Sequence, residues 1–361
     1  MARVLLSGYY GFGNFGDEAL LEVIVANIRR RFPSSQLEVL SATPKATAAA
    51  HRVEAAPRWD WRAIRAAIAR ADVVLSGGGG LLQNATSLRS LLYYAGILRE
   101  AIRAHRKTMI FAQSIGPLDF WGRLVVHYFC AGTNRATVRD SRSRLLLAKL
   151  LSNTPVEQTA DPVFLYEAPH DVDLRNDGLG PESGPYAAIS VRPSPALRDA
   201  PAVIGRAVDR LADRHGIRSA FVALGGASDA AAATDVIRAC KSSPVLLPEC
   251  TPAKAASILR GARVVVGMRL HALILAARYA VPFLAIAYDP KVSALCDDLR
   301  YPLPRLWSVG ERRPLDDAID ALVDRLVDER ETLRSHLSEC RERIVAAAER
   351  NFDVLGELID A

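Results

Sequence analysis

The chain has 361 residues, of which 50% are apolar and 24% charged, a composition typical of a soluble globular protein with two domains. Lysine and arginine number 46 against 40 aspartates and glutamates, so the net charge is +6, and the cations form no block. This pattern argues against a nucleic-acid-binding tail or a polybasic membrane anchor, whereas a modest positive charge suits an anionic small substrate or an anionic lipid-linked one.

Cysteine usage and hydropathy point to the cytoplasm. The five cysteines are scattered and form no CxxC pair, so neither a disulfide framework nor a zinc ribbon is expected. The N-terminus lacks the long apolar segment of a signal peptide. The most apolar stretch, residues 273–288, is interrupted by Arg278 and Pro282 and does not predict a spanning helix. We therefore expect a cytoplasmic protein, with at most peripheral contact with the inner membrane face.

In the first half of the chain, short β-rich runs alternate with longer helical runs. The predicted strands are residues 3–7, 36–41, 72–76 and 108–114, and the predicted helices are 17–31, 61–70 and 87–105. This alternation predicts βαβ units and a parallel sheet.

A polar stretch rich in Pro, Gly and Asp, residues 167–185, is the best candidate for a domain linker. A second alternating series follows. Its predicted strands are 186–191, 218–224, 244–248, 262–267 and 282–288, its predicted helices are 202–215, 229–240, 252–260 and 269–279, and residues 315–361 form a helical tail. The sequence thus predicts an α/β protein of two facing Rossmann-like, doubly wound domains, 1–170 and 171–361, with C-terminal helices free to pack back on the first domain.

The first strand is followed by the loop GYYGFGNFGDEAL, in which Gly11, Gly13 and Gly16 match a dinucleotide-binding fingerprint. NAD binding is nevertheless disfavoured. Asp17 and Glu18 fall in the first helical turn, where their carboxylates compete with a pyrophosphate for the helix N-terminus.

The same loop carries the aromatic residues Tyr9, Tyr10, Phe12 and Phe15. Their rings are expected to offer stacking faces to a neutral sugar. The structural alternative is a tight turn with a helix cap at Asp17 and internal aromatic packing.

Two further loops follow predicted strands. In SGGGGLLQN, residues 76–84, four glycines including Gly78 and Gly79 are expected to leave backbone N–H groups bare for a closely approaching ligand. In AQSIGP, residues 112–117, Gln113 and Ser114 supply polar groups. Because ligands bind beyond the carboxyl ends of parallel strands, both loops are candidates for the site.

The fourth loop region, residues 264–291, carries the most chemistry. Arg269 and His271 open a predicted helix, and the next strand is expected to deliver Asp289 and Lys291 to the same sheet edge. The helix dipole disfavours the cationic form of a His there, and a bound phosphate or carboxylate restores it. Lys291 is one of only six lysines, which suggests a specific cation. A hydrogen-bonded structural role for His271 remains the alternative.

Arginines follow two more predicted strands. Arg139 precedes Asp140 in VRDSRS, and Arg192 ends SVR. An anion-binding role and a surface ion pair are both open for these side chains. Asp161 of TADPVF is read as a structural residue that stops a strand.

These motifs together resemble the polysaccharide pyruvyl transferase family, in particular its CsaB branch. The matching pieces are GYYGFGNFGDEAL, SGGGGLLQ, AQSIGP, VRDSRS, TADPVF, GMRLHALILAA and AYDPK, spread over residues 3–300. The resemblance implies a GT-B-like fold and transfer of an enolpyruvyl unit from phosphoenolpyruvate to a sugar as a cyclic ketal. In the CsaB branch that sugar is N-acetylmannosamine of a lipid-linked secondary cell wall polysaccharide, whose pyruvate binds the SLH domains of surface-layer proteins.

The resemblance also implies roles for individual residues. The catalytic set is Arg139, His271 and Lys291, and the substrate-binding set is Arg269, Arg192, Tyr10, Phe12, Asn14, Asp17, Gly78, Gly79, Gln83 and Gln113. His271 is expected to act as the general acid and the cations to hold phosphoenolpyruvate, with no cofactor or metal. This sequence departs from the family's pattern at Gly225-Gly226, where relatives often carry a polar residue.

The first domain is expected to bind the acceptor and the second phosphoenolpyruvate, with the loops 8–16 and 76–80 facing 267–291 across a cleft. One alternative is a nucleotide-sugar glycosyltransferase of the same fold, which usually needs a ribose-binding glutamate; none lies between Glu249 and Glu311. The other alternative is a non-catalytic glycan-binding protein. The acceptor's linkage and the oligomeric state, including a homo-oligomer, stay open.

Overall fold

The computed structural model describes residues 2–85, 87–169, 171–194, 200–306 and 318–361. The chain divides into two compact units. Unit 1 comprises Met1–Leu165 together with Ile344–Ala361, and unit 2 comprises Tyr166–Arg343. The division lies close to the predicted boundary after residue 170. The end of the helical tail belongs to unit 1, a possibility that the sequence left open.

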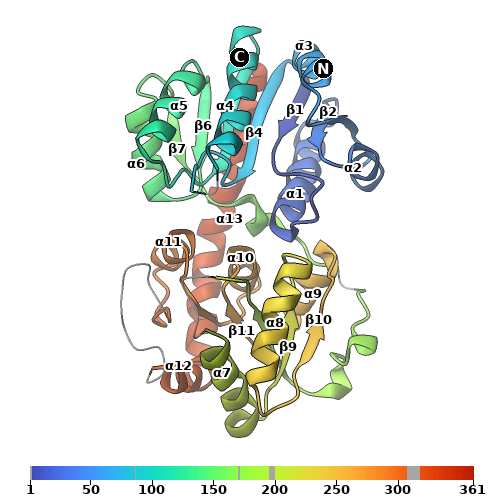
Figure 1. Ribbon diagram of the computed structural model, residues 1–361, viewed down its shortest axis with the longest axis vertical. Helices are drawn as coiled ribbons and strands as arrows, with labels where there is room; N and C mark the ends of the chain where they lie inside the picture. The colour runs from blue at the N-terminus through green and yellow to red at the C-terminus, as the bar shows by residue number, and fades with distance from the viewer. Residues whose placement is uncertain (1, 86, 170, 195–199, 307–317) are drawn as a thin grey trace. The chain divides into compact units, whose positions relative to one another are not determined.

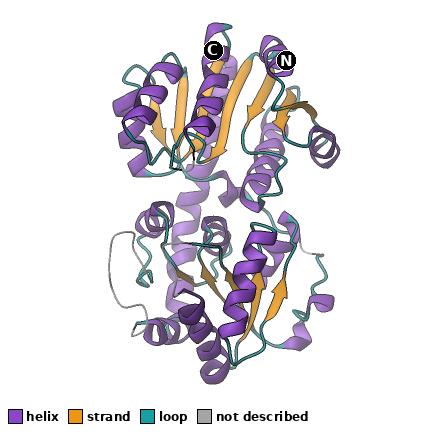
Figure 2. Cartoon of the chain, viewed as in Figure 1, coloured by secondary structure: helices purple, strands orange, loops and turns teal. Residues whose placement is uncertain are grey.

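Unit 1 is built on a seven-stranded sheet of order β3-β2-β1-β4-β5-β6-β7, in which all paired strands are parallel (Figures 1 and 2). Its elements are β1 (Arg3–Ser7), α1 (Phe15–Arg31), β2 (Gln36–Ser41), α2 (Pro44–His51), β3 (Glu54–Pro57), α3 (Trp61–Arg70), β4 (Val73–Gly79), α4 (Leu88–Arg103), β5 (Lys107–Gln113), α5 (Phe120–Cys130), β6 (Arg135–Val138), α6 (Ser141–Leu150), β7 (Val156–Gln158) and the 3-10 turn η1 (Pro162–Leu165). The predicted parallel sheet is confirmed.

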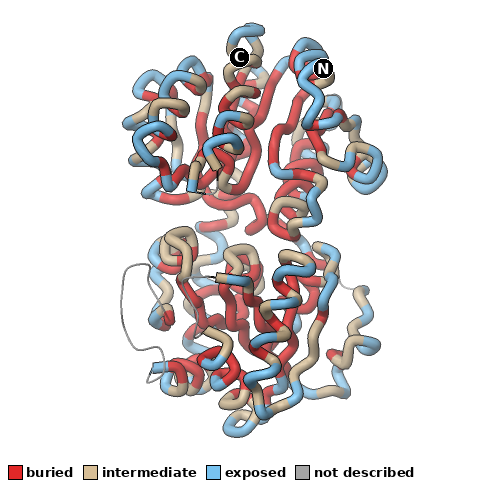
Figure 3. Tube along the Cα trace, in the orientation of Figure 1, coloured by how far each residue is buried: buried red, intermediate tan, exposed pale blue. Residues whose placement is uncertain are grey.

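Strands β1, β4 and β5 of unit 1 are buried along almost their whole length, because successive side chains point to opposite faces of the sheet and helices cover both faces (Figure 3). Val4 and Leu6 pack in one cluster with side chains of α1 and with Phe352, which lies on the C-terminal helix. Leu5 packs on the other side, in a cluster with Ile64 of α3. Helices α4, α5 and α6 contribute to a further cluster with β5 and β6. Thus α1 and the C-terminal helix cover one face, and α3 to α6 cover the other.

Unit 2 contains a five-stranded parallel sheet of order β10-β9-β8-β11-β12. Its elements are η2 (Arg175–Asp177), η3 (Pro181–Ser183), β8 (Tyr186–Ser190), α7 (Ala200–His215), β9 (Arg218–Val222), α8 (Ala227–Ala239), β10 (Val245–Leu247), α9 (Pro252–Gly261), β11 (Val264–Gly267), α10 (Leu270–Arg278), β12 (Phe283–Ala285), α11 (Pro290–Leu299), α12 (Ile319–Asp328) and α13 (Arg330–Asp360). Ile189, Phe221 and Val266 pack with α7 and α12 in its core. Helix α13 contributes residues to both units.

The polar stretch 167–185 is not a free linker. Arg260 of α9 donates hydrogen bonds to the carbonyl oxygens of Ala168, at 2.9 Å, and Pro169, at 3.0 Å, which hold this segment within unit 2. The predicted strand 282–288 is also too long, since β12 ends at Ala285 and Asp289 caps a helix that the sequence reading missed. Among the described residues, no helix combines the length and apolar composition needed to cross a membrane.

Candidate active site

In unit 2, two helices begin at the carboxyl ends of neighbouring strands. Strand β11 ends at Gly267, which pairs with Ala285 of β12. Helix α10 then begins at Leu270 and α11 at Pro290. His271 and Lys291 are therefore each the second residue of a helix at one sheet edge. The N–H groups and the dipoles at both helix starts favour an anion there.

Arg269, which precedes α10, is held by a buried carboxylate. Its Nε donates to Oδ2 of Asp229 at 2.7 Å, and a terminal nitrogen donates to Oδ1. Asp229 is fully buried in the first turn of α8 and also accepts from the backbone N–H of Gly225 at 2.8 Å. These two parallel hydrogen bonds form a fork and fix the orientation of the guanidinium. The side chain of Arg269 remains 18% exposed.

This fork explains the glycine at position 225. A Cβ added there would collide with the guanidinium of Arg269 and would lie 2.7 Å from Asp229 Oδ1. The departure from the family pattern thus makes room for the Arg269–Asp229 pair, a consequence that the sequence alone did not reveal.

Arg192 follows β8 and Tyr288 follows β12, the two strands on either side of β11. Their side chains contact each other across the end of β11. Nη1 of Arg192 donates to the hydroxyl oxygen of Tyr288 at 2.9 Å, and the guanidinium carbon lies 5.2 Å from the ring centroid. Burial raises the pKa of Tyr288, while the positive charges of Arg192 and Arg269 act in the opposite direction. Arg192 and Arg269 thus lie near a neutral phenol at the edge where α11 begins with Pro290 and Lys291. Sequence reasoning missed Tyr288, although it directly precedes Asp289.

In unit 1, two of the four rings of the first loop are unavailable to a ligand. Tyr10 is 1% exposed, and its hydroxyl donates to the carbonyl oxygen of Gly77 at 2.8 Å. Phe15 is also buried. The expectation of a stacking face is therefore wrong for these two residues, because both serve the core of the unit. Tyr9 and Phe12 are each 39% exposed and stack on one another with ring centroids 4.1 Å apart.

The loop is closed by hydrogen bonds from its own residues. Asn14, and not Asp17, caps α1, because Asn14 Oδ1 accepts from the N–H of Gly16 at 3.1 Å. Glu18 accepts from the N–H groups of Gly11, at 2.9 Å, and Gly13, at 3.2 Å. A carboxylate thus occupies the N–H groups that a dinucleotide fingerprint presents to pyrophosphate, which agrees with the reading against NAD.

The glycine run continues strand β4 instead of forming a free loop. Gly77 pairs with Phe111 and Gly79 with Gln113 of β5. Gly78 and Gly79 have φ of 70° and 74°, a left-handed backbone that favours glycine, and a Cβ at Gly79 would lie 3.0 Å from a carboxylate oxygen of Asp17.

Two residues predicted to contact the substrate lie at or after the ends of β4 and β5. Gln113 is fully buried, and its Nε2 donates to Ser76 at 2.8 Å, so it joins the two strands. Gln83 is half-buried in the segment after β4. Substrate contacts of Gln83 and of the glycines stay predictions.

Arg139 is part of a buried network at the ends of β5, β6 and β7. Its Nε donates to Ser114 Oγ at 2.7 Å, and a terminal nitrogen donates to the carboxylate of Asp161. Ser114 in turn donates to Asp140 at 2.9 Å. Both members of the Arg139–Asp161 pair are almost fully buried, at 6% and 3% exposure. Asp161 also accepts from the backbone N–H of Val163 at 3.0 Å, so it joins Arg139 to the turn η1. The structural reading of Asp161 and the catalytic role of Arg139 both stay predictions.

Arg58, which directly follows β3, is a buried cation that sequence reasoning missed. Its guanidinium donates to the carbonyl oxygen of Gly8 at 2.8 Å and to the hydroxyl of Tyr94 at 2.9 Å. The rings that lie within 6 Å of it belong to Tyr9, Phe12, Trp59, Tyr93 and Tyr94. Arg58 thereby fixes the aromatic part of the first loop. The available signal in the sequence was the motif RWDW, in which two tryptophans follow the arginine.

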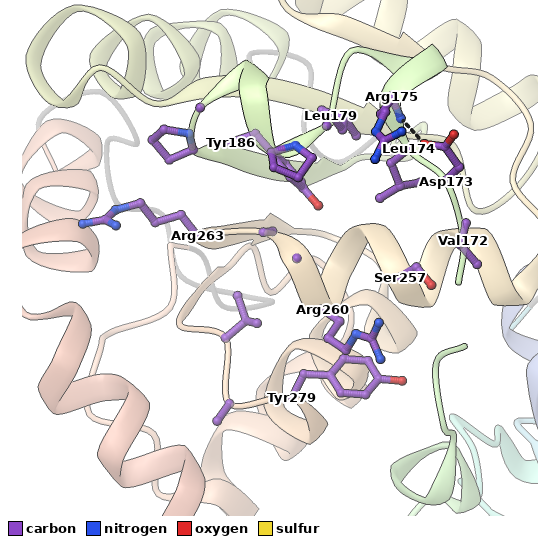
Figure 4. A pocket seen from close by; sticks show the side chains of 18 of the residues that line it. Val172, Asp173, Leu174, Arg175, Leu179, Tyr186, Ser257, Arg260, Arg263 and Tyr279 are labelled. Carbon is purple, nitrogen blue, oxygen red and sulfur yellow. Dashed lines mark hydrogen bonds between the residues drawn. The ribbon is translucent and has the colours of Figure 1, made fainter. Parts of the chain in front are cut away.

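Unit 2 also contains a pocket of about 850 Å³ that is not part of this edge (Figure 4). It is lined by Tyr186, Arg263 and Pro282, which lie at the amino ends of β8, β11 and β12, so it opens at the opposite end of the sheet. In the described part of the chain, no three His, Cys, Asp or Glu side chains are arranged to hold a metal ion.

The fold is similar to several solved nucleotide-sugar enzymes. S. aureus MnaA, solved with UDP, has a TM-score of 0.68 at 11% identity, over 100% of this chain and 97% of that chain. Anabaena HepE, solved with UDP-glucose, has a TM-score of 0.67 at 11% identity, over 99% and 100%. UDP-GlcNAc 2-epimerase from Neisseria meningitidis, solved with UDP-GlcNAc, has a TM-score of 0.64 at 10% identity, over 99% and 100%.

At this identity the likeness defines the fold, which is GT-B-like, as predicted. No curated protein matches the sequence. The family model described as polysaccharide pyruvyl transferase matches residues 14–290, which span most of unit 1 and most of unit 2. The chain belongs to the polysaccharide pyruvyl transferase family.

Proposed function

We propose that this transferase moves the enolpyruvyl group of phosphoenolpyruvate onto an amino sugar and forms a cyclic pyruvate ketal. The observation that carries the proposal is the cationic edge of unit 2, where Arg192, Arg269 and Lys291 meet two helix starts. Phosphoenolpyruvate carries a carboxylate and a phosphate, and arginine and lysine at helix N-termini suit both groups. The proposed acceptor is N-acetylmannosamine of a lipid-linked cell wall precursor, as in the CsaB branch, and the proposed location is the cytoplasm.

The proposed chemistry assigns one proton transfer to His271. His271 delivers a proton to the methylene carbon of phosphoenolpyruvate, which leaves an oxocarbenium-like centre at the neighbouring carbon. One sugar hydroxyl attacks that centre and gives its proton back to His271. The C–O bond to phosphate then breaks, with the phosphate charge stabilised by Arg269 and Lys291, and leaves a second oxocarbenium-like carbon. The second hydroxyl attacks this carbon, which closes the ring, and its proton goes to the released phosphate. The sum is one phosphate and one ketal, with no cofactor required.

For the acceptor, we propose unit 1. The exposed and mutually stacked rings of Tyr9 and Phe12 support this assignment, since an aromatic face suits the apolar side of a sugar. Replacing Phe12 by Ala is expected to raise the acceptor KM more than the phosphoenolpyruvate KM. The reverse pattern would assign the first loop to the donor.

The direct test incubates the protein with phosphoenolpyruvate and aryl-tagged or lipid-linked amino-sugar disaccharides, and measures phosphate release and the mass of the sugar product. His271→Ala is expected to lower turnover by roughly 10²- to 10⁴-fold while phosphoenolpyruvate binding stays within a few-fold. Normal turnover of this variant at saturating donor would remove His271 from the acid role. Binding of a nucleotide sugar with glycosyl transfer, or glycan binding without phosphate release, would support one of the two alternatives instead.

A further inference from the structure

The exposed apolar side chains of the protein are unevenly distributed. Every large hydrophobic residue that is exposed in the described part of the chain lies between Tyr9 and Leu145 of unit 1. Beyond the first loop, they are Trp59 next to α3, Trp61 on α3, Leu88 and Leu92 on α4, Phe120, Trp121 and Tyr128 on α5, and Leu145 on α6. Exposed apolar side chains gathered on one face usually mark a binding surface.

These helices form one layer. Helices α3, α4, α5 and α6 contact one another in sequence and cover one side of the unit 1 sheet (Figure 1). We call the outer side of this layer the α3–α6 face. On the other side of the sheet lie α1 and the end of α13.

The charge of the α3–α6 face is strongly positive. Its four helices carry ten cations, Arg62, Arg65, Arg70, Arg89, Arg99, Arg103, Arg123, Arg142, Arg144 and Lys149, against one carboxylate, Glu100. Helix α1, on the other side, carries three acids and three arginines. The four helices thus carry a net charge of +9, which their capping residues Asp60, Asp119 and Asp140 reduce to +6, the net charge of the whole chain. A charge of one sign concentrated on one face creates a field that attracts polyanions.

Few of these arginines are neutralised by neighbours. Glu100 pairs with Arg65 at 3.0 Å and with Arg103 at 3.2 Å, and Glu38 of β2 pairs with Arg70 at 2.7 Å. No ion pair joins Arg142 or Arg144 to a carboxylate within the described residues, and both side chains are exposed on α6. Their charges remain available to a partner.

A groove on the same face combines both properties. It has a volume of about 510 Å³, and its lining includes Trp61 and Arg65 of α3, Arg99, Glu100 and Arg103 of α4, and Tyr128 of α5, so that three cations stand against one carboxylate. Cations beside tryptophan and tyrosine are the side chains that settle at the headgroup level of a bilayer, with the rings in the apolar part and the charges on anionic headgroups.

We propose that the α3–α6 face docks unit 1 on the surface of an anionic phospholipid bilayer. The chemistry favours this occupant over a nucleic acid, because exposed Phe, Trp and Leu side chains gain little from a phosphate backbone but are buried in a headgroup layer. The proposal does not depend on the reaction and is tested without substrate.

The experiment sediments the full chain with vesicles of phosphatidylcholine and of an equal mixture of phosphatidylcholine and phosphatidylglycerol. Three of the chain's four tryptophans, Trp59, Trp61 and Trp121, lie on or beside the face, so a blue shift of intrinsic fluorescence reports the same event. We expect binding and a blue shift with the mixed vesicles, weakening with added salt.

Paired variants test the face itself. Arg142→Gln/Arg144→Gln is expected to weaken binding roughly 30-fold at low salt, since each basic residue near an anionic surface contributes about fivefold. The matched control Arg29→Gln/Arg30→Gln removes the same charge from α1 and should leave binding nearly unchanged. Trp121→Ser should weaken binding at all salt concentrations.

Four results would overturn the proposal. The first is that the chain does not bind the mixed vesicles, and the second is that it binds vesicles of phosphatidylcholine alone equally well. The third is that the two double variants lose the same amount of vesicle affinity. The fourth is that a DNA duplex binds the chain as tightly as the mixed vesicles do, with an affinity that Trp121→Ser leaves unchanged. Self-association that Trp121→Ser abolishes, without vesicle binding, would assign the face to a second copy of the chain.

Discussion

The guanidinium of Arg269 lies so close to the backbone of residue 225 that a single methyl group there decides its position. We expect Gly225→Ala to displace the Arg269 fork from Asp229 and to raise the KM for phosphoenolpyruvate at least tenfold, because a charge-assisted pair is lost. Gly96→Ala in α4 is the control, since a Cβ there makes only an ordinary contact, 3.5 Å from the ring of Trp61. Equal donor KM values for the two variants, with equal stability in urea, would contradict this role of Gly225.

Lys291 supports a second prediction on donor binding. Lys291→Ala is expected to weaken phosphoenolpyruvate binding roughly 10- to 100-fold, since a hydrogen bond to a charged group contributes about 1.5–3 kcal/mol. Lys291→Arg should restore it only in part, because a planar fork replaces a compact ammonium. Calorimetric titration measures both, and Lys241→Ala, an exposed lysine of the same unit, is the control. Full affinity in Lys291→Ala would remove Lys291 from the donor site.

Single residues were also where sequence reasoning fell short. Strand-end position correctly brought Arg269, His271 and Lys291 to one edge, because parallel strands end together. It could not tell an exposed ring from a buried one, so Tyr10 was read as a ligand although it serves the core. The motif RWDW marks Arg58, but the sequence does not show its partners Gly8 and Tyr94, which come from segments far apart in the chain.

At the scale of elements, hydrogen bonds from Arg210 and His215 of α7 to the carboxylate of Asp324 connect α7 to α12. Asp324 of α12 accepts from Arg210 Nε at 3.0 Å and Nη2 at 2.6 Å, and from His215 Nε2 at 2.9 Å. The hydrogen bonds from Arg210 hold the pKa of Asp324 well below its ordinary value of 3.8. A carboxylate with a lowered pKa in the folded state stabilises the fold above pH 3.8, and this contribution is lost as the pH falls further.

We therefore expect Asp324→Asn to lower the stability of unit 2 at neutral pH and to make the loss of stability below pH 3.8 shallower than in the parent chain. Urea unfolding at a series of pH values measures both effects. Asp235→Asn is the matched control, because its pair with Arg238 is exposed and contributes little. An unchanged acid dependence in Asp324→Asn would show that other carboxylates set it.

Element type was largely predictable from the sequence, and element ends were less so. Both alternating series were found because buried parallel strands are short apolar runs between amphipathic helices. Helix α11 was missed because its N-terminal residues, Asp289 and Pro290, looked like the end of the preceding strand. The glycines after Ser76 looked like a loop, yet Gly79 pairs with Gln113. Propensity could not show this pairing, which neighbouring strands impose.

At the scale of the molecule, unit 1 is discontinuous in sequence, because it is completed by Ile344–Ala361. Phe352 of α13 is fully buried with its ring centroid 5.2 Å from that of Phe111. Asn351 accepts from Thr159 Oγ1 at 2.8 Å and donates to the carbonyl oxygen of Ala160 at 2.9 Å. The end of α13 is thus part of the core of unit 1.

A chain that ends at Arg343 is therefore expected to lose the native fold of unit 1 while unit 2 persists. Removing these side chains exposes the part of the sheet face that α13 covers beside α1, and leaves buried polar groups without partners. Limited proteolysis with mass spectrometry should show cleavage throughout residues 2–165 and protection of 166–343. Equal protection of both regions in the shortened and the full chain would contradict the assignment of α13 to the core.

The course of α13 also fixes the order of events on the ribosome. All of unit 2 is translated between residue 165 and residue 344. The strands of unit 1 therefore leave the ribosome before the end of α13, which completes their core, has been synthesised. During that interval the sheet face that Phe352 and Leu355 later cover is open to chaperones or to aggregation. The speed of translation through unit 2 is therefore expected to set how long this apolar face of nascent unit 1 stays uncovered.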